Sequence, residues 1–200
     1  HRYQGDAKRV LIIDIPDTTS VKKVGFDDKF LDKDLFDLTI GRRVLKKELK
    51  EFGIPVYSSN VVSPFGFVES SQLKNFSIPS IIWGIDGNFG WNYIEKDYKF
   101  DVTDHCGRIT TSHPKINLKY IWYYLLPHTF EYGFNRSFRA SLNNIYENVF
   151  LEIPVDKDGE FDLDYQDMIV EKMDKFEVVR KNLLDFLQYT SISKIDFGNY

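Results

Sequence analysis

The sequence predicts an α+β protein, in which a mostly β globular domain is followed by one long C-terminal helix. Short apolar runs separated by Gly, Pro and Asn fill most of the 200-residue chain, which is typical of many short strands. By contrast, no Gly or Pro occurs between residues 164 and 197. Aromatic residues make up 16% of the chain, enough to bury a large core. We expect a globular domain over residues 1–154, with residues 1–32 as an N-terminal extension packed on it, and an acidic linker with a long helix over residues 155–200.

The strands of the globular part are predicted from short apolar and alternating runs. Residues 36–40 alternate Phe, Asp, Leu, Thr and Ile, a period of two that predicts a half-buried strand. Other strands are expected at residues 9–15, 55–57, 65–68, 80–83, 98–102 and 149–153.

Helices and turns are predicted from capping residues and helix breakers. A short helix is expected at residues 43–52, closed by Gly53. Periodicity does not decide between helix and strand for residues 119–126, and residues 138–146 fit a turn or a short helix. Turns with unusual backbone angles are expected at Gly84, Gly87 and Gly90.

The C-terminal segment carries an apolar seam at helical spacing. Steps of three and four residues predict an amphipathic helix of about 25 residues, with a seam narrow enough to pair with a partner helix. The alternative is that the seam packs on its own domain. The seam consists of Ile169, Met173, Phe176, Val179, Leu183 and Leu187.

The charge of the chain is unevenly distributed. The formal net charge is -4, but residues 40–150 carry 13 basic and 10 acidic groups, whereas residues 151–176 carry 3 basic and 9 acidic groups. Five of the ten residues from 41 to 50 are Lys or Arg. Such local density suits a surface that binds phosphates, although a solvated helix face would also explain it.

Catalytic motifs are missing from the sequence. There is no P-loop, no Gly-x-Ser-x-Gly elbow and no Asp/Asn-Pro-Pro-aromatic motif of amino-methylating enzymes. The run Asp104-His105-Cys106 lacks metal-ligand spacing, so neither a metal nor another cofactor is expected. A single cysteine, no signal peptide and no bilayer-length apolar run predict a cytoplasmic protein, and a first residue of His rather than Met suggests that the chain was cut from something longer.

Five segments of the chain stand in a recognisable order: Leu35–Leu45, which contains Gly41-Arg42-Arg43, then Gly53–Ser59, Pro79–Gly87, Thr103–Gly107, and Leu151–Val155 together with Asp158–Asp162. This order resembles the target recognition domains of type I restriction-modification DNA specificity subunits, over roughly residues 33–188. The ending Asp-Gly-Glu-Phe-Asp is most similar to the single-domain modules paired with, or fused to, type II restriction-methylation enzymes. A full type I subunit carries two such domains, and this chain has room for one.

The resemblance implies a module that recognises a specific sequence in double-stranded DNA. It implies that residues 1–154 are the target recognition domain and that the helix is a spacer and dimerisation arm, pairing with a second copy or a second recognition domain. Methylation and cleavage would belong to methyltransferase and restriction subunits or fused domains, so the chain itself is expected to be non-catalytic.

Two sets of residues are expected to contact DNA on this interpretation, while the acidic stretch 156–167 should face away from it. Basic residues would hold phosphates, and loop residues would face the major groove, whose pattern of donors and acceptors distinguishes all base pairs. The first set is Arg42, Arg43, Lys46, Lys47, Lys115, Arg136 and Arg139, and the second is Ser58, Ser59, Asn60, Asn88 and Trp91.

Two other functions remain open at this point. The aromatic residues could form the site of a protein- or glycan-binding β domain. Less favoured is a metal-dependent nuclease that would use Asp17, Glu48 and Lys50, because Glu48 and Lys50 lie in the basic, helix-like stretch instead of on a buried strand.

Overall fold

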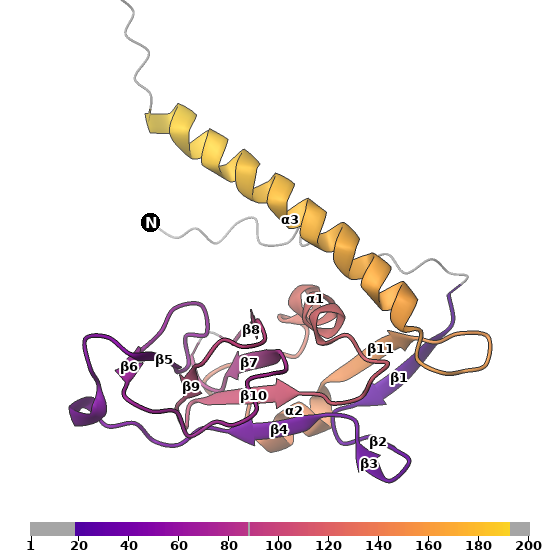
Figure 1. Ribbon diagram of the computed structural model, residues 1–200, viewed down its shortest axis with the longest axis horizontal. Coiled ribbons are helices and arrows are strands. Elements are labelled where there is room, and N and C mark those ends of the chain that lie inside the picture. The colour runs from indigo at the N-terminus through magenta and orange to yellow at the C-terminus, as the bar shows by residue number, and fades with distance from the viewer. Residues whose placement is uncertain (1–18, 88, 193–200) are drawn as a thin grey trace, which may run out of the picture.

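The computed structural model describes residues 19–87 and 89–192, so the strand expected at residues 9–15 lies outside the described part. The predicted α+β class with a long C-terminal helix is confirmed (Figure 1). The elements are β1 (Val21–Gly25), β2 (Lys29–Phe30), β3 (Lys33–Asp34), β4 (Asp37–Ile40), a 3-10 turn η1 (Lys46–Glu48), β5 (Ile54–Tyr57), β6 (Gly66–Val68), β7 (Ser80–Gly84), β8 (Trp91–Ile94), β9 (Asp101–Val102), β10 (Cys106–Thr110), α1 (Leu118–His128), α2 (Leu142–Asn148), β11 (Phe150–Pro154) and α3 (Leu163–Ile192).

A four-stranded antiparallel sheet forms the centre of the domain, in the order β4-β10-β7-β8. Every residue of β7 and β10 is buried, so these two strands are covered on both faces. A smaller sheet, β6-β5-β9, lies beside it and contains one parallel pair, β5 with β9. The remaining strands form the β1–β11 ribbon and the short β2–β3 hairpin.

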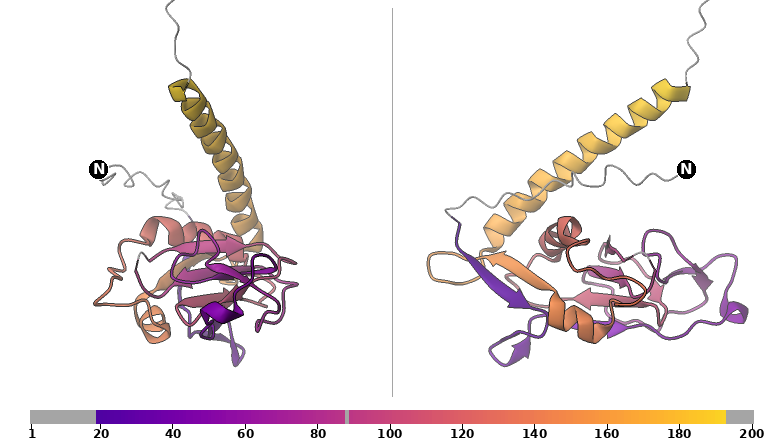
Figure 2. Two further views of the ribbon diagram at one scale, coloured as in Figure 1. Left: turned by 90° about the vertical axis from the view of Figure 1, so that its left-hand side faces the viewer. Right: turned by 180° about the vertical axis from the view of Figure 1, so that it is seen from behind.

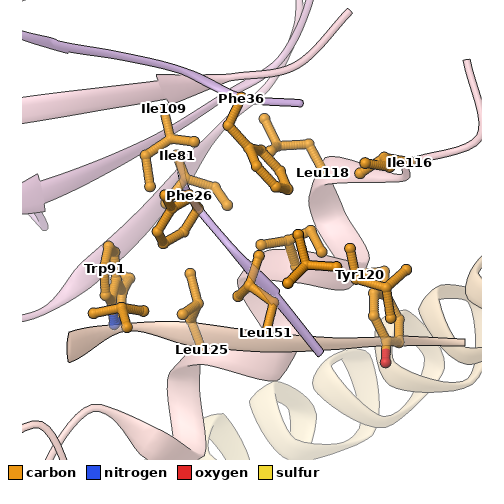
Figure 3. Packing of buried hydrophobic residues seen from close by; sticks show 14 of the residues in the cluster. Phe26, Phe36, Ile81, Trp91, Ile109, Ile116, Leu118, Tyr120, Leu125 and Leu151 are labelled. Atoms are coloured by element: carbon orange, nitrogen blue, oxygen red, sulfur yellow. The ribbon is translucent and has the colours of Figure 1, made fainter. Parts of the chain in front are cut away.

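The two faces of the central sheet are covered by different parts of the chain. Alternate residues of β7 enter different apolar clusters: Ile81 and Trp83 join α1 and the β1–β11 ribbon, whereas Ile82 joins residues of β5 and β9. Figure 3 shows the larger cluster, in which side chains of the sheet, of α1 and of the ribbon meet. Trp83 also donates a hydrogen bond from Nε1 to the carbonyl of Ala140 at 2.8 Å.

The ambiguous segment 119–126 is helical, and its first turn explains why. The side chain of Asn117 accepts hydrogen bonds from the amides of Lys119 and Tyr120, as an N-cap does. Ser141 caps α2 in the same way through the amide of Asn144. The strand expected at residues 98–102 is confirmed only in its last two residues, β9.

The helix predicted over residues 43–52 is wrong, because long-range backbone pairing holds this segment extended. Arg42 forms a bridge with Thr103 and Lys50 forms one with Phe67, which leaves room for only the single 3-10 turn η1. Among the glycines expected in turns, only Gly87 has a left-handed backbone, with φ 75°. Gly84 instead ends β7, where a Cβ atom would lie 2.3 Å from the carbonyl oxygen of Ser59.

The acidic segment after Pro154 is a tight turn, and the prediction of a linker is corrected. Val155 and Phe161 form a bridge, and the Asp156 carboxylate accepts hydrogen bonds from the amides of Asp158 and Glu160. Phe161 is buried in the core. The turn therefore connects β11 to α3 without a flexible spacer.

Helix α3 is 30 residues long, and only its beginning packs on the domain. Ile169 and Met173 are buried in the larger core cluster, so these two seam residues pack on their own domain. Beyond them the helix projects away from the body, as the views in Figures 1 and 2 show. The four later seam residues are exposed: Phe176, Val179, Leu183 and Leu187. None of the helices in the described residues could span a lipid bilayer.

Polar contacts attach the first turns of α3 to the segment around α1. Buried Gln166 donates from Nε2 to the carbonyl oxygens of Lys115 and Asp162, at 3.0 Å each, and its Oε1 accepts from the amide of Asn117 at 2.9 Å. These three hydrogen bonds use both N–H donors of the Gln166 side chain and one acceptor site of its oxygen. The Gln166 side chain therefore joins two turns of backbone that are far apart in the sequence.

A second contact lies about two turns further along the helix. The carboxylate of Asp174 accepts from Lys119 Nζ at 2.9 Å and from the hydroxyl of Tyr123 at 2.6 Å. Burial and this hydrogen bond raise the pKa of Tyr123 above its ordinary value, so the hydroxyl keeps its proton and remains a donor. Apolar packing and two polar contacts thus set the direction in which α3 leaves the domain.

Replacing Gln166 with Ala should lower the free energy of unfolding by about 2–3 kcal/mol, because two backbone carbonyls and one amide lose a buried partner. Urea unfolding followed by circular dichroism measures the change. Gln72→Ala, at an exposed glutamine, is the matched control and should change stability by less than about 0.5 kcal/mol. Equal effects of the two substitutions would contradict the role given to Gln166.

Candidate nucleic-acid interface

Loops from four strands meet at one end of the central sheet. Ile40 pairs with Gly107, Cys106 with Gly84, and Trp83 with Trp91. The segment after β4, the residues before β10 and the β7–β8 loop therefore leave the sheet at the same end. Helix α3 leaves the body on the far side, beside β1 and β11 (Figure 1).

The basic segment 41–50 lies at this end. Arg43, Lys46 and Lys47 are exposed and form no ion pair with the residues that the structure describes. Arg42 differs, because its guanidinium pairs with the Glu48 carboxylate at 2.8 Å. The Leu45 amide and Arg42 both donate to Glu48 and hold the pKa of its carboxyl below the ordinary value. Among the described residues, the segment therefore offers four exposed basic side chains without an ion pair: Arg43, Lys46 and Lys47 at the 3-10 turn, and Lys50 at the bridge to Phe67.

The loop between β5 and β6 lies next to this segment. Ser58 accepts a hydrogen bond from the Thr103 hydroxyl at 2.9 Å, and Leu49 packs against Gly66 at the end of the loop. A hollow of about 750 Å³ opens between this loop and the β7–β8 loop. It is lined by Ser58, Ser59, Asn60, Val61, Val62, Ser63, Pro64, Phe65, Phe89, Gly90 and Trp91.

Two residues predicted to face DNA are used within the domain. Trp91 lines the hollow, but its side chain is only 5% exposed and packs against Trp83 and Phe89, because it faces inward from β8. The predicted surface contact by Trp91 is therefore corrected to a core position. Asn60 is engaged in the turn of its own loop, where its side chain bonds to the amides of Val62 and Ser63. Asn88 lies outside the described residues.

Arg139 reaches the same end of the sheet from the loop between α1 and α2. Its guanidinium forms an ion pair with Asp86 in the β7–β8 loop, and His105 also contacts the Asp86 carboxylate. Partial burial raises the pKa of Asp86, but hydrogen bonds from His105 and Arg139 outweigh it and hold the pKa below the ordinary value. Arg139 is thus a partly neutralised cation, whereas neighbouring Arg136 is exposed.

An aromatic series attaches the Arg136 loop to the hollow. Phe89 contacts Phe134 with ring centres 4.8 Å apart, and Phe134 contacts Phe138 at 5.1 Å. Because each ring contacts the next, from Phe89 to Phe134 to Phe138, the loop that carries Arg136 is held beside the β7–β8 loop.

Lys115 lies at the other end of the sheet. It follows β10 and forms an ion pair of 3.8 Å with Glu160 in the acidic turn before α3. The structure therefore separates Lys115 from the other basic residues of the expected set. The acidic turn that carries Glu160 also lies at this far end.

The nuclease alternative finds no support in the described residues. Among the described residues, no three His, Cys, Asp or Glu side chains are grouped so that they could hold a metal ion. Glu48, proposed for the nuclease alternative, is paired with Arg42, and Asp17 lies outside the described residues. Exposed basic side chains and a hollow lined by both polar and apolar residues lie at this end of the sheet.

Sequence reasoning missed Val62, which is exposed at the tip of the β5–β6 loop. The signal was a second valine directly after Val61 in an otherwise polar loop, where only one of the two can face the core. Phe65 is half-exposed on the same loop.

Comparison with known proteins identifies the family and the fold. A family model for the type I restriction modification DNA specificity domain matches residues 25–184. No curated protein matches the chain in sequence. The family resemblance drawn from the ordered segments is confirmed.

Three solved structures share the fold at low sequence identity. The S subunit of the type I restriction-modification system from M. genitalium gives a TM-score of 0.63 at 16% identity, covering 88% of this chain and 44% of that one. A structure of the complex assembly and conformational transition of the type I R-M system gives 0.63 at 14%, covering 94% and 44%. The HsdS subunit from Thermoanaerobacter tengcongensis gives 0.57 at 12%, covering 88% and 40%. The chain spans less than half the length of each of these proteins.

The Asp86 pair predicts a pH dependence of stability. Because the folded-state pKa of Asp86 is depressed, its stabilisation is present above the unfolded pKa, about 3.9, and is lost as the pH falls through the folded value. Asp86→Asn should therefore destabilise the protein at pH 7, by no more than about 1 kcal/mol for an exposed pair, and the difference from wild type should shrink below about pH 4.

Urea unfolding of both proteins between pH 3 and pH 7 measures this difference, with exposed Asp185→Asn as the control. A difference that is constant over the whole pH range would contradict the role of the ion pair.

Proposed function

Because the chain belongs to the family of type I restriction-modification DNA specificity domains, we propose that it recognises a specific sequence in double-stranded DNA and directs methyltransferase and restriction subunits, or fused domains, to that site. The observation that carries the proposal is the meeting of the basic segment 41–50, the polar β5–β6 loop and the Arg136 loop at one end of the sheet. Among the described residues, Glu48 of the nuclease alternative is paired with Arg42, and Phe89 and Trp91, which a protein- or glycan-binding site would use, are packed against each other.

Phosphate contacts and base contacts would come from different residues. Arg43, Lys46 and Lys47 are exposed and unpaired among the described residues, which suits them to fix the domain on the DNA backbone. Arg42, Arg136 and Arg139 would add to this contact, with Arg42 and Arg139 weakened by their own carboxylate partners. Ser58 and Ser59 would present hydroxyl groups to base edges in the major groove.

The far end of the sheet would keep away from DNA. Residues 151–176 carry nine acidic groups against three basic ones, and most of them belong to the acidic turn and the start of α3. DNA would be repelled from this region and attracted to the basic end, which orients the domain on the duplex. Lys115 would then stabilise the acidic turn through its ion pair with Glu160 and would not contact DNA.

Helix α3 would act as the spacer arm of the assembly. Its exposed seam of Phe176, Val179 and Leu183 fits pairing with the helix of a second copy or of a second recognition domain. The solved S subunits of this fold are about twice as long as this chain, which leaves room in them for a second unit. Pairing through α3 would set the spacing between the two recognised half-sites.

The chemistry would belong to other polypeptides or fused domains. The chain would need no cofactor of its own, and it would act in the cytoplasm beside its methyltransferase. On this proposal the chain determines only where on the duplex the reaction takes place.

Selection from a random duplex library tests the function. The purified chain should enrich one sequence class, because base contacts add discrimination to a general attraction for phosphates. Sequencing of the bound pool measures the enrichment, and addition of a cognate methyltransferase should then methylate the enriched site alone. A bound pool as random as the input, with equal methylation of every duplex, would overturn the proposal.

The basic segment provides the second arm of this test. Replacing Arg43, Lys46 and Lys47 with Ala should weaken binding to selected and unrelated duplexes alike, and should reduce the slope of log affinity against log salt by about 2–3. The control replaces three lysines away from this end, Lys33, Lys157 and Lys172, and should leave the slope unchanged.

Leu183→Lys should abolish self-association through α3, because it places a charge in the apolar seam without touching the domain core. We expect the dimer dissociation constant to rise by at least about tenfold in sedimentation equilibrium. Val178→Lys, which lies one turn away and off the seam, is the matched control. A wild-type chain that stays monomeric at all concentrations, or equal effects of both changes, would contradict pairing of two copies.

A further inference from the structure

The β5–β6 loop is held in place by the domain before any ligand binds. The Asn60 side chain accepts from the amides of Val62 and Ser63 at 2.9 and 3.4 Å, and its Nδ2 donates to the Ser63 hydroxyl at 3.0 Å. Asn92 on β8 donates to the carbonyl of Val61 at 2.7 Å, and the Phe65 amide donates to Val56 at 2.7 Å. Contacts at both ends and at the tip therefore hold the backbone of the loop in place.

Two neighbouring valines of this loop have opposite surroundings. Val61 is 4% exposed and packs in the smaller core cluster, whereas Val62 is 83% exposed. No other large apolar side chain among the described residues is as exposed as Val62. Because Val61 is buried and the Asn60 turn fixes the backbone between them, Val62 is forced outward and stays there.

Val62 stands in the surface that we propose binds DNA. It lines the hollow together with the hydroxyl-bearing residues Ser58, Ser59 and Ser63. The half-exposed ring of Phe65 belongs to the same hollow. Leu49 of the basic segment contacts Gly66 directly after Phe65, so the basic segment and the end of this loop are neighbours.

The major groove offers one apolar group on its base edges, the 5-methyl group of thymine. A β-branched side chain such as valine has few rotamers and loses little entropy when it is covered. A polar base edge opposite Val62 would instead lose its water without gaining a hydrogen bond. An outward, pre-ordered valine next to phosphate contacts is therefore matched to a methyl group.

We propose that Val62, flanked by Phe65, packs against the 5-methyl group of a thymine in the major groove and so determines one base pair of the recognised sequence. The inference rests on the proposed function and adds the identity of one base. It also gives Asn60 a positioning role, in which its side chain supports the turn that presents Val62.

Thymine-to-deoxyuracil exchange tests the contact, because it removes only the methyl group. In the duplex obtained by selection, each thymine is replaced in turn. Wild-type affinity should fall about fourfold at one position, the factor expected for one buried methyl-sized group, and should be unchanged at the others. Val62→Ala should bind the thymine duplex more weakly and show no difference between thymine and uracil at that position.

Two further variants separate this contact from a general effect. Val62→Ile should keep the discrimination, since it retains a branched apolar surface. Val178→Ala, at an exposed valine of α3, should behave as wild type. Thermal unfolding should be the same for all these variants, because neither Val62 nor Val178 is in the core.

The outcomes distinguish the two proposals. A chain that selects no sequence refutes both. A chain that selects a sequence without thymine, that ignores uracil at every position, or whose Val62→Ala variant loses affinity equally for thymine and uracil refutes the role of Val62 alone.

Discussion

Both faces of β7 and β10 are covered, so the loops of the central sheet can present side chains to a ligand only at its two ends. α1 and the β1–β11 ribbon occupy one face, and β5 and β9 occupy the other. A sheet that buries apolar side chains on both faces resists deformation, since protein interiors are close-packed. The loops at each end are therefore carried on a rigid frame, and their relative positions follow from strand register.

The two ends of this frame differ in charge and in what is attached to them. One end carries the basic segment and the hollow, and the other carries the acidic turn and the base of α3. Ion pairs at the basic end neutralise some of its cations: Arg42 by Glu48 and Arg139 by Asp86. Fewer basic side chains are therefore free to bind phosphates than the sequence suggests, and they are centred on Arg43, Lys46 and Lys47.

Contacts between α3 and the segment around α1 fix the orientation of α3 relative to the domain, and so relative to the basic end. Ile169 and Met173 supply the apolar contact, while Gln166 and Asp174 supply the polar one. A helix attached by both kinds of contact cannot rotate about its axis or swing without breaking buried hydrogen bonds. Any partner bound along the exposed part of α3 is thus held at a defined position relative to the DNA-binding end.

The sequence by itself determined the α+β class, the strand at residues 36–40, the long helix and the family, because alternation, helical spacing and ordered motifs are local properties of the chain. Periodicity could not decide residues 119–126, where the Asn117 cap and packing on the sheet produce a helix. Only the tertiary structure decided the state of residues 43–52, since bridges from Arg42 to Thr103 and from Lys50 to Phe67 join residues distant in sequence. The same holds for the site: the burial of Trp91 and the position of the β5–β6 loop depend on contacts between β5, β8 and the segment before β10, which no single stretch of sequence contains.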